Sequence, residues 1–251
     1  MKTHKIGIAL SGGGARGFAH LGALQALNER GIFPNIVSGT SAGSIAGLFY
    51  AAGISPQDTL KILKSKSLFH FARPMWLKPG LMNLDGFREL LLDNITARTF
   101  ADLKLEFMAC ASNLNTGKAE YLNEGNVIDS VIASASIPFF FNPMQIGDFH
   151  YADGGIIDNL PIRPLLGKCD KIIAISISSL IETADVDSIV KVAARSFQMS
   201  ILKHDEKMIA QCDLFIEPKA IMDYQLFDFD KAEEMYQIGY DEIMNSTIDF
   251  I

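Results

Sequence analysis

The residues best suited to chemistry lie in one five-residue run, Gly39-Thr40-Ser41-Ala42-Gly43. The run follows a short apolar segment at 36–37 and precedes a helical pattern at 44–52, so it predicts a sharp turn from a strand into a helix. Such a turn lifts the hydroxyl of Ser41 into an open site, and the flanking glycines let strand and helix approach closely. Unpaired N–H groups at the helix N-terminus favour negative charge there. The run therefore predicts Ser41 as a nucleophile, with a simple Ser/Gly-rich helix cap as the alternative.

A second chemical pattern is the glycine-rich run Ser11-Gly12-Gly13-Gly14-Ala15-Arg16-Gly17. Three successive glycines allow positive φ angles, which turn the backbone N–H groups inward to bind an anion. Beside a nucleophilic serine, that anion would be the oxygen of a tetrahedral intermediate. We expect Gly12, Gly13 and Gly14 to form an oxyanion hole. Arg16 would add positive charge, fix the loop, or form a surface ion pair.

The same run allows another interpretation, because it matches G-x-G-x-x-G between a strand and a helix. This pattern is typical of a nucleotide-binding oxidoreductase, which also needs an acidic residue after the next strand to hold the ribose. Residues 36–39, Ile-Val-Ser-Gly, contain no carboxylate. A P-loop is excluded because no Lys-Ser or Lys-Thr follows the glycines. We therefore expect no cofactor.

A nucleophilic serine needs a base, which is usually a histidine oriented by an acid. Of the five histidines, only His204 fits the order serine, acid, histidine, and its charged surroundings at 203–207 are typical of a solvated helix face. His20 lies one turn after the glycine-rich run and is expected to support it. Asp153, in Tyr151-Ala152-Asp153-Gly154-Gly155, is the better candidate, with an ordinary turn aspartate as the alternative. Spacing alone does not decide between these two interpretations.

The elements that must position these residues alternate along the chain. Strand patterns occur at 6–10, 36–37, 105–111, 118–122, 171–177 and 214–216, a hairpin within 144–157, and helix patterns at 15–30, 44–52, from 55 onward, and at 84–95, 127–135, 186–211 and 231–245. Strands separated by helices predict an α/β fold of three layers, with a mostly parallel central sheet and helices on both faces. Ligands bind at the carboxyl ends of such strands, where both glycine-rich turns fall. Without repeats or linkers, residues 1–251 are expected to form a single domain.

Composition excludes several classes of function. The net charge is −7 and no basic run is present, which argues against nucleic acid as a partner. The three cysteines are far apart and odd in number, which favours free thiols in a reducing compartment. The apolar run at 6–10 is too short for a signal peptide, and no stretch approaches ~18 apolar residues. We expect a soluble, cytoplasmic protein.

Taken in order, the runs at 12–17 and 39–43 and the Asp-Gly-Gly at 153–155 resemble the patatin-like phospholipases. The resemblance covers at least residues 5–178. It implies that Ser41 is the nucleophile and Asp153 its direct base, with no catalytic histidine and no metal. It also implies oxyanion N–H groups from the glycine-rich loop near Arg16, an acyl-enzyme, and acyl esters of lipids as substrates. Head group, chain length and oligomeric state stay open, and a catalytically silent binding module is the remaining alternative.

Two apolar segments raise the question of how a lipid enters. Residues 67–82 contain the only Trp and predict either a lid at a lipid surface or an irregular segment packed on the core. The run at 137–141, Ile-Pro-Phe-Phe-Phe, predicts either a wall of the acyl pocket or core. The expected partners are a lipid ester substrate and, transiently, a membrane or micelle surface. A working Ser–Asp pair also requires Asp153 to be shielded from water and to touch the Ser41 hydroxyl.

Overall fold

The computed structural model describes residues 4–65, 84–178, 187–202 and 205–249. A mixed, mostly parallel sheet crosses the molecule, with its strands in the order β5-β6-β3-β2-β1-β7-β8 and β4 paired to β3. The parallel strands are β1 (Ile6–Leu10), β2 (Ile36–Thr40), β3 (Glu106–Asn113), β7 (Lys171–Ile175) and β8 (Leu214–Ile216). The antiparallel strands are β4 (Lys118–Leu122), β5 (Met144–Ile146) and β6 (Phe149–Asp153). The predicted fold class is confirmed.

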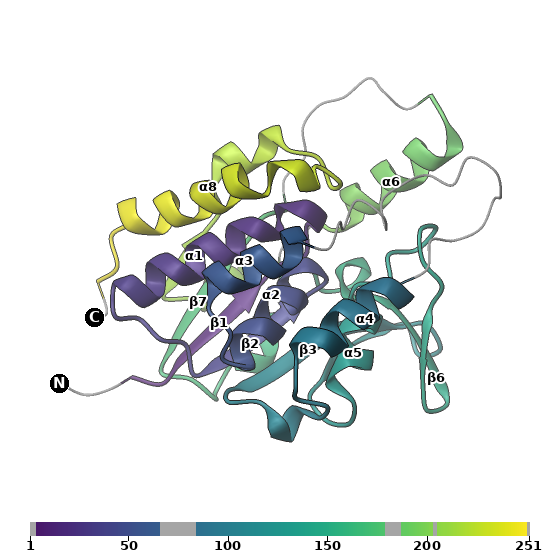
Figure 1. Ribbon diagram of the computed structural model, residues 1–251, viewed down its shortest axis with the longest axis horizontal. Helices are drawn as coiled ribbons and strands as arrows, with labels where there is room; N and C mark the ends of the chain where they lie inside the picture. Colours follow the sequence, from purple (N-terminus) through teal and green to yellow (C-terminus); the bar gives the residue numbers. More distant parts are fainter. Residues whose placement is uncertain (1–3, 66–83, 179–186, 203–204, 250–251) are drawn as a thin grey trace.

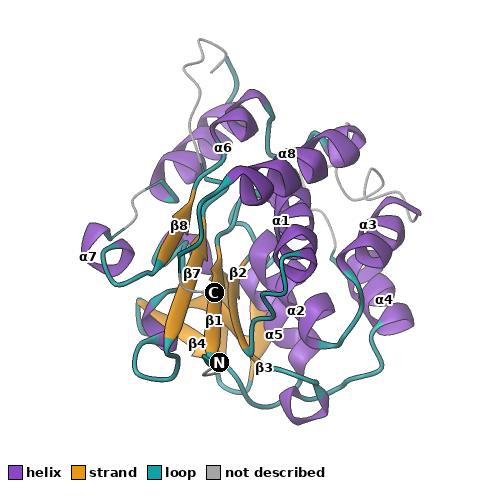
Figure 2. Ribbon diagram, turned by 90° about the vertical axis from the view of Figure 1, so that its left-hand side faces the viewer, coloured by secondary structure: helices purple, strands orange, loops and turns teal. Residues whose placement is uncertain are grey.

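The helices divide unequally between the two faces of the sheet (Figures 1 and 2). The larger layer contains α1 (Phe18–Glu29), α2 (Ala42–Ala51), α3 (Pro56–Ser65), α4 (Asp85–Asn94), α5 (Val127–Ser134) and α8 (Ala232–Asn245). The thinner layer contains the segment 157–170, with a 3₁₀ turn at Arg163–Leu165, and α7 (Glu206–Ile209). The core is split in the same way, since Ile8 packs in the larger cluster and its neighbour Ala9 in the smaller one. Alternate residues of a buried strand face opposite layers, which explains its continuous apolar sequence.

Helices α1 and α8 cross in close contact. A Cβ atom added at Gly22 would lie 1.8 Å from the carbonyl oxygen of Tyr236, and one at Gly239 would lie 1.9 Å from that of Ala19. The two backbones therefore touch at a point where only glycine fits. This contact holds the C-terminal helix against the first helix of the chain.

One predicted element is wrong. The helix predicted at 186–211 is two helices, α6 (Ile189–Ser200) and the short α7. The side chain of Asp205 accepts a hydrogen bond from the backbone N–H of Lys207 and so caps a new helix. Short 3₁₀ turns also interrupt the predicted pattern, at Gly14–Gly17, Phe100–Asp102, Gly154–Ile156, Lys219–Asp223 and Phe229–Lys231.

The structure also bears on the cysteines and on membrane-spanning helices. Cys110, Cys169 and Cys212 are all free thiols. Among the described residues, no helix has the length and apolarity needed to cross a membrane.

Candidate active site

Ser41 and Asp153 lie at the ends of two strands, β2 and β6, that meet beside β3. β2 runs parallel to β3 and ends with Thr40 opposite Cys110. β6 runs antiparallel to β3 and ends with Asp153 opposite Ala111. Because β4 pairs with both Cys110 and Ala111, it occupies the other edge of β3, so β2 and β6 share a single edge. Their carboxyl ends meet there, which brings Ser41, the residue after Thr40, next to Asp153.

The backbone at Ser41 is strained and held at both ends. Its φ of 51° and ψ of −119° are rare for a residue with a side chain. Its N–H donates to Oγ of Ser134 at 2.9 Å, and its carbonyl accepts from Oγ of Ser44 at 2.7 Å. A Cβ at Gly43 would lie 2.2 Å from the carbonyl oxygen of Leu10, so this turn requires glycine. The predicted strand-to-helix turn is present, and Ser41 is 6% exposed.

The carboxyl of Asp153 is shielded from water, with 1% of the residue exposed. Burial raises its pKa to about 7, against the smaller opposing effects of the Ser41 hydroxyl and the Gly155 N–H. Oδ1 accepts the Gly155 N–H at 2.8 Å. Oδ2 accepts no hydrogen bond of standard geometry from the described residues, although the Ser41 hydroxyl is close enough to lower the pKa. Asp153 therefore has one oxygen held and one available to accept a proton.

The glycine-rich loop is anchored at both ends and open in the middle. The N–H of Gly12 donates to the carbonyl of Asn159 at 3.2 Å, and that of Ala15 to the carbonyl of Leu226 at 2.8 Å. Between them, the N–H groups of Gly13 and Gly14 donate to no other loop or side chain in the described part of the chain. Gly14 has the positive φ, 61°, that this loop was expected to need. Two of the three predicted oxyanion donors are thus free, and that of Gly12 is engaged.

Arg16 is buried, and its side chain points to the C-terminal part of the chain. Its Nε and Nη2 donate to the carbonyl of Tyr224 at 2.8 and 2.6 Å. Burial lowers the pKa of this guanidinium, and the charge of Asp228 opposes the shift. Of the roles considered for Arg16, these contacts match that of fixing the loop.

Of the two histidines considered as bases, His20 lies within the described residues and His204 does not. His20 is fully buried and donates from Nε2 to the carbonyl of Ser11 at 2.8 Å, which fixes its tautomer because a carbonyl can only accept. Burial lowers the pKa of His20 to about 4, so the ring is neutral and supports the glycine-rich loop as expected. His204 lies outside the described residues. Within those residues, no group of three or more His, Cys, Asp or Glu side chains could hold a metal ion.

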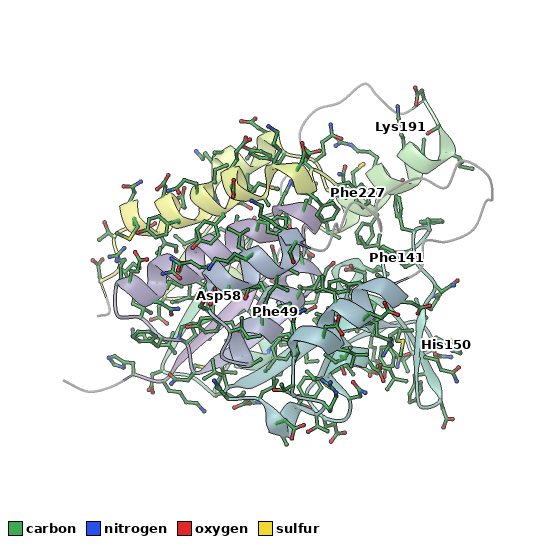
Figure 3. All side chains as sticks on the ribbon, viewed as in Figure 1. Phe49, Asp58, Phe141, His150, Lys191 and Phe227 are labelled. Carbon is green, nitrogen blue, oxygen red and sulfur yellow. The ribbon has the colours of Figure 1, made fainter. Side chains whose placement is uncertain are left out.

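An apolar pocket opens beside Ser41. Its walls come from the glycine-rich loop, from α1 to α4 and from the 135–141 loop, and include Phe18, Ile45, Leu63, Phe87, Ile137 and Phe141 (Figure 3, where Phe141 is labelled). Ile137 and Phe141 also pack in one cluster with Phe197 of α6 and with Ile201, which follows this helix. The run 137–141 therefore contributes to the pocket wall, while the predicted lid at 67–82 lies outside the described residues.

Three polar residues at the site were missed from the sequence. Ser134 holds the Ser41 amide, while Asn159 and Ser178 bond to one another and to Gly12. Their only signal in the sequence is a small polar residue within an apolar stretch. That signal does not name a partner 93 or 166 positions away.

Ser41 lies on a strained strand-to-helix turn, next to a buried carboxyl at the end of a mostly parallel sheet. These features define an α/β protein whose serine turn has the form of a nucleophile elbow. The chain belongs to the patatin-like phospholipase family, whose model matches residues 8–166. An NTE-family protein of Mycobacterium bovis is 30% identical over 69% of this chain and 49% of its own length. The lysophospholipase nte1 of Aspergillus fumigatus is 29% identical over 94% of this chain and 18% of its own. The chain thus spans half or less of these relatives.

The fold is shared with a solved structure. VipD of Legionella pneumophila superposes with a TM-score of 0.64 over 96% of this chain and 66% of its own, at 17% identity.

Proposed function

We propose that the protein is a serine lipid acyl hydrolase, of the phospholipase A or lysophospholipase type, that works through a Ser41–Asp153 dyad. The observation that carries the proposal is the meeting of Ser41 with a fully buried carboxyl of pKa about 7, at the wall of an apolar pocket. An ordinary aspartate, with a pKa near ~3.9, is a weak base. A pKa near 7 suits general base catalysis at neutral pH without a histidine.

The positions of these groups support the following reaction. Oδ2 of Asp153 accepts the Ser41 proton as Oγ attacks the ester carbonyl carbon, and the carbonyl electrons move to the oxygen. The N–H groups of Gly13 and Gly14 stabilise this oxyanion, and Arg16 holds their loop through Tyr224. The intermediate collapses, Asp153 returns the proton to the leaving alcohol, and an acyl-enzyme remains. Water then attacks the acyl carbon as Asp153 takes its proton, and Asp153 passes that proton to Oγ of Ser41 as the bond between Oγ and the acyl carbon breaks and the fatty acid leaves.

Lipid esters are the proposed substrates because the pocket next to Ser41 is lined almost entirely by apolar side chains. Such a wall fits a hydrocarbon chain and makes few contacts that would distinguish head groups. The family and the name of the Aspergillus fumigatus relative support phospholipids and lysophospholipids. Mass analysis of products released from a mixed lipid extract identifies the preferred ester.

We also propose transient contact with a membrane or micelle surface. Phe139 is 74% exposed and has a φ of 71°, so a strained backbone holds an aromatic ring in water between the pocket residues Ile137 and Phe141. α6 packs on the same loop and exposes further apolar side chains, Ile189, Val192 and Met199. With a net charge of −7, contact through apolar insertion is favoured over attraction to anionic lipid.

A fluorophosphonate probe tests the nucleophile. The wild type and Ser130→Ala, which removes a buried hydroxyl that donates to the carbonyl of Asn126 at the start of α5, should be labelled, and Ser41→Ala should not. Labelling of Ser41→Ala would refute the proposed nucleophile. No labelling or esterase activity in the wild type would favour a catalytically silent module.

A further inference from the structure

We infer that Ser178 and Asn159 are positioning residues that aim the Gly13 N–H at the oxyanion by fixing the Gly12–Gly13 peptide plane. The inference rests on the proposed acyl hydrolase function and adds two residues to its machinery. Both side chains are buried, and both come from segments that follow the Asp-Gly-Gly turn in the sequence.

The polar groups of Gly12 are all engaged. Its carbonyl accepts a hydrogen bond from Oγ of Ser178 at 2.8 Å and from Oγ of Ser11 at 3.1 Å. The Ser178 hydroxyl is oriented in turn by Nδ2 of Asn159, which donates to it. The backbone carbonyl of Asn159 accepts the Gly12 N–H at 3.2 Å. Asn159 therefore holds Gly12 from both sides, directly at its N–H and through Ser178 at its carbonyl.

Fixing the Gly12 carbonyl fixes the next amide. A trans peptide is planar, so the carbonyl of Gly12 and the N–H of Gly13 point in opposite directions within one rigid unit. Glycine has no Cβ to restrict rotation of that unit. In a run of three glycines, hydrogen bonds to the carbonyl must therefore set the direction of the N–H. Ser178 does this from the side opposite to the proposed oxyanion.

The location of the Asn159 amide supports a role at the site. A Cβ at Gly12 would lie 2.5 Å from Oδ1 of Asn159 and 3.2 Å from Cβ of Ser41, and one at Gly155 would lie 2.9 Å from the same Oδ1 and 3.0 Å from Oδ1 of Asp153. The amide thus sits between the glycine-rich loop and the Asp-Gly-Gly turn. Oδ1 is buried and has no hydrogen-bond partner among the described residues. A buried acceptor without a partner destabilises the folded state. Stability therefore does not explain Asn159 at this position, whereas the hydrogen bond from Nδ2 to Ser178 does.

The test compares a ligand that forms an oxyanion with one that does not. A long-chain alkyl trifluoromethyl ketone adds to Ser41, forming an O–C bond and an oxyanion while Asp153 takes the proton. The alkyl alcohol of equal chain length only fills the pocket. Ser178→Ala should weaken the binding of the ketone by about tenfold or more, which is part of the effect of losing an oxyanion donor. It should lower kcat by a similar factor. It should leave the alcohol affinity and KM unchanged.

Matched variants separate positioning from general damage. Ser178→Thr keeps the hydroxyl and should restore ketone affinity, and Asn159→Leu, which keeps the side-chain volume, should resemble Ser178→Ala. Ser130→Ala should change neither ligand. Unchanged ketone affinity in both Ser178→Ala and Asn159→Leu would overturn the inference, as would an equal loss of ketone and alcohol binding. Activity that survives in Ser41→Ala would instead overturn the proposed function, whatever the Ser178 variants do.

Discussion

The carboxyl of Asp153 is fully buried, and it must lose its proton for the proposed reaction. Burial raises its pKa to about 7, while the groups around it supply only partial compensation. As general base, it works only when ionised, so kcat/KM should fall tenfold per pH unit below about pH 7 and level off above. The pH profile on a short-chain, water-soluble ester checks this. A flat profile down to pH 5 would exclude Asp153 as the base.

Ionisation of the same carboxyl should raise activity but lower the free energy of unfolding. Its folded pKa lies above the unfolded value of ~3.9, so its contribution is complete below that pH and is lost as the pH rises through 7, by about 4 kcal/mol. Asp153→Asn should therefore gain about that much stability relative to wild type between pH 4 and 8, while losing activity by about 10²–10⁴. Urea unfolding at several pH values measures it. The difference between Ser130→Ala and wild type, where no titratable group changes, should stay constant with pH.

His20 produces the contrasting case. Its folded pKa of about 4 lies below the ~6.5 of an unfolded histidine, so stability is lost as the pH falls through that interval, by about 3 kcal/mol. In the wild type this loss partly cancels the gain from Asp153. His20→Gln should therefore uncover the Asp153 gain, so that stability relative to wild type rises by about 3 kcal/mol as the pH falls from 6.5 to 4. An unchanged acid slope in urea unfolding would mean that His20 is not the buried neutral group described here.

At the level of single residues, the sequence identified those whose chemistry depends on local context. Ser41 and the glycines stand in runs whose backbone demands are local, so their types and spacing predict the turn. Asn159 and Ser178 act through hydrogen bonds to Gly12 across the sheet. Nothing next to them in the sequence specifies that contact.

Among the elements, the α1–α8 crossing makes the sharpest demand on residue size. Replacing a helical glycine by alanine ordinarily stabilises a helix by about 0.5–1 kcal/mol. At Gly22 the new Cβ would overlap the carbonyl of Tyr236, so Gly22→Ala should instead destabilise by about 2–3 kcal/mol. Chemical denaturation measures the change. Gln237→Ala, on the exposed face of α8, is the control, and equal stability of the two variants would contradict the close contact.

Element positions followed well from the sequence where apolar periodicity was uninterrupted, as in β1 and α8. The helix predicted at 186–211 failed because both α6 and α7 have helical composition, while α6 ends at Ser200 and Asp205 caps the start of α7. The meeting of β2 and β6 could not be predicted either. It depends on which edge of β3 each strand occupies, and that is a tertiary choice.

For the whole molecule, the distribution of exposed apolar side chains predicts how the protein meets its substrate. Phe139→Asp should reduce hydrolysis of micellar or vesicular lipid by about tenfold or more, because a charge replaces a ring that would enter the lipid layer. It should change hydrolysis of a monomeric soluble ester little. Phe33→Asp is the matched control, since Phe33 is 59% exposed and precedes the N-terminal end of β2, whereas Ser41 follows its C-terminal end. Equal losses on both substrates would remove the proposed surface contact.

The strand order has a further consequence, for the way the chain is made. β1 is synthesised about 165 residues before β7, with which it pairs on one side. A nascent chain that has reached residue 150 already carries the Ser41 turn, yet it lacks Asp153, Asn159, Ser178 and the Tyr224 carbonyl that anchors Arg16. Chains of that length would therefore carry Ser41 without its proposed base. The proposed hydrolysis would therefore require that the segments carrying Asp153, Ser178 and Tyr224 have docked on β1 and β2.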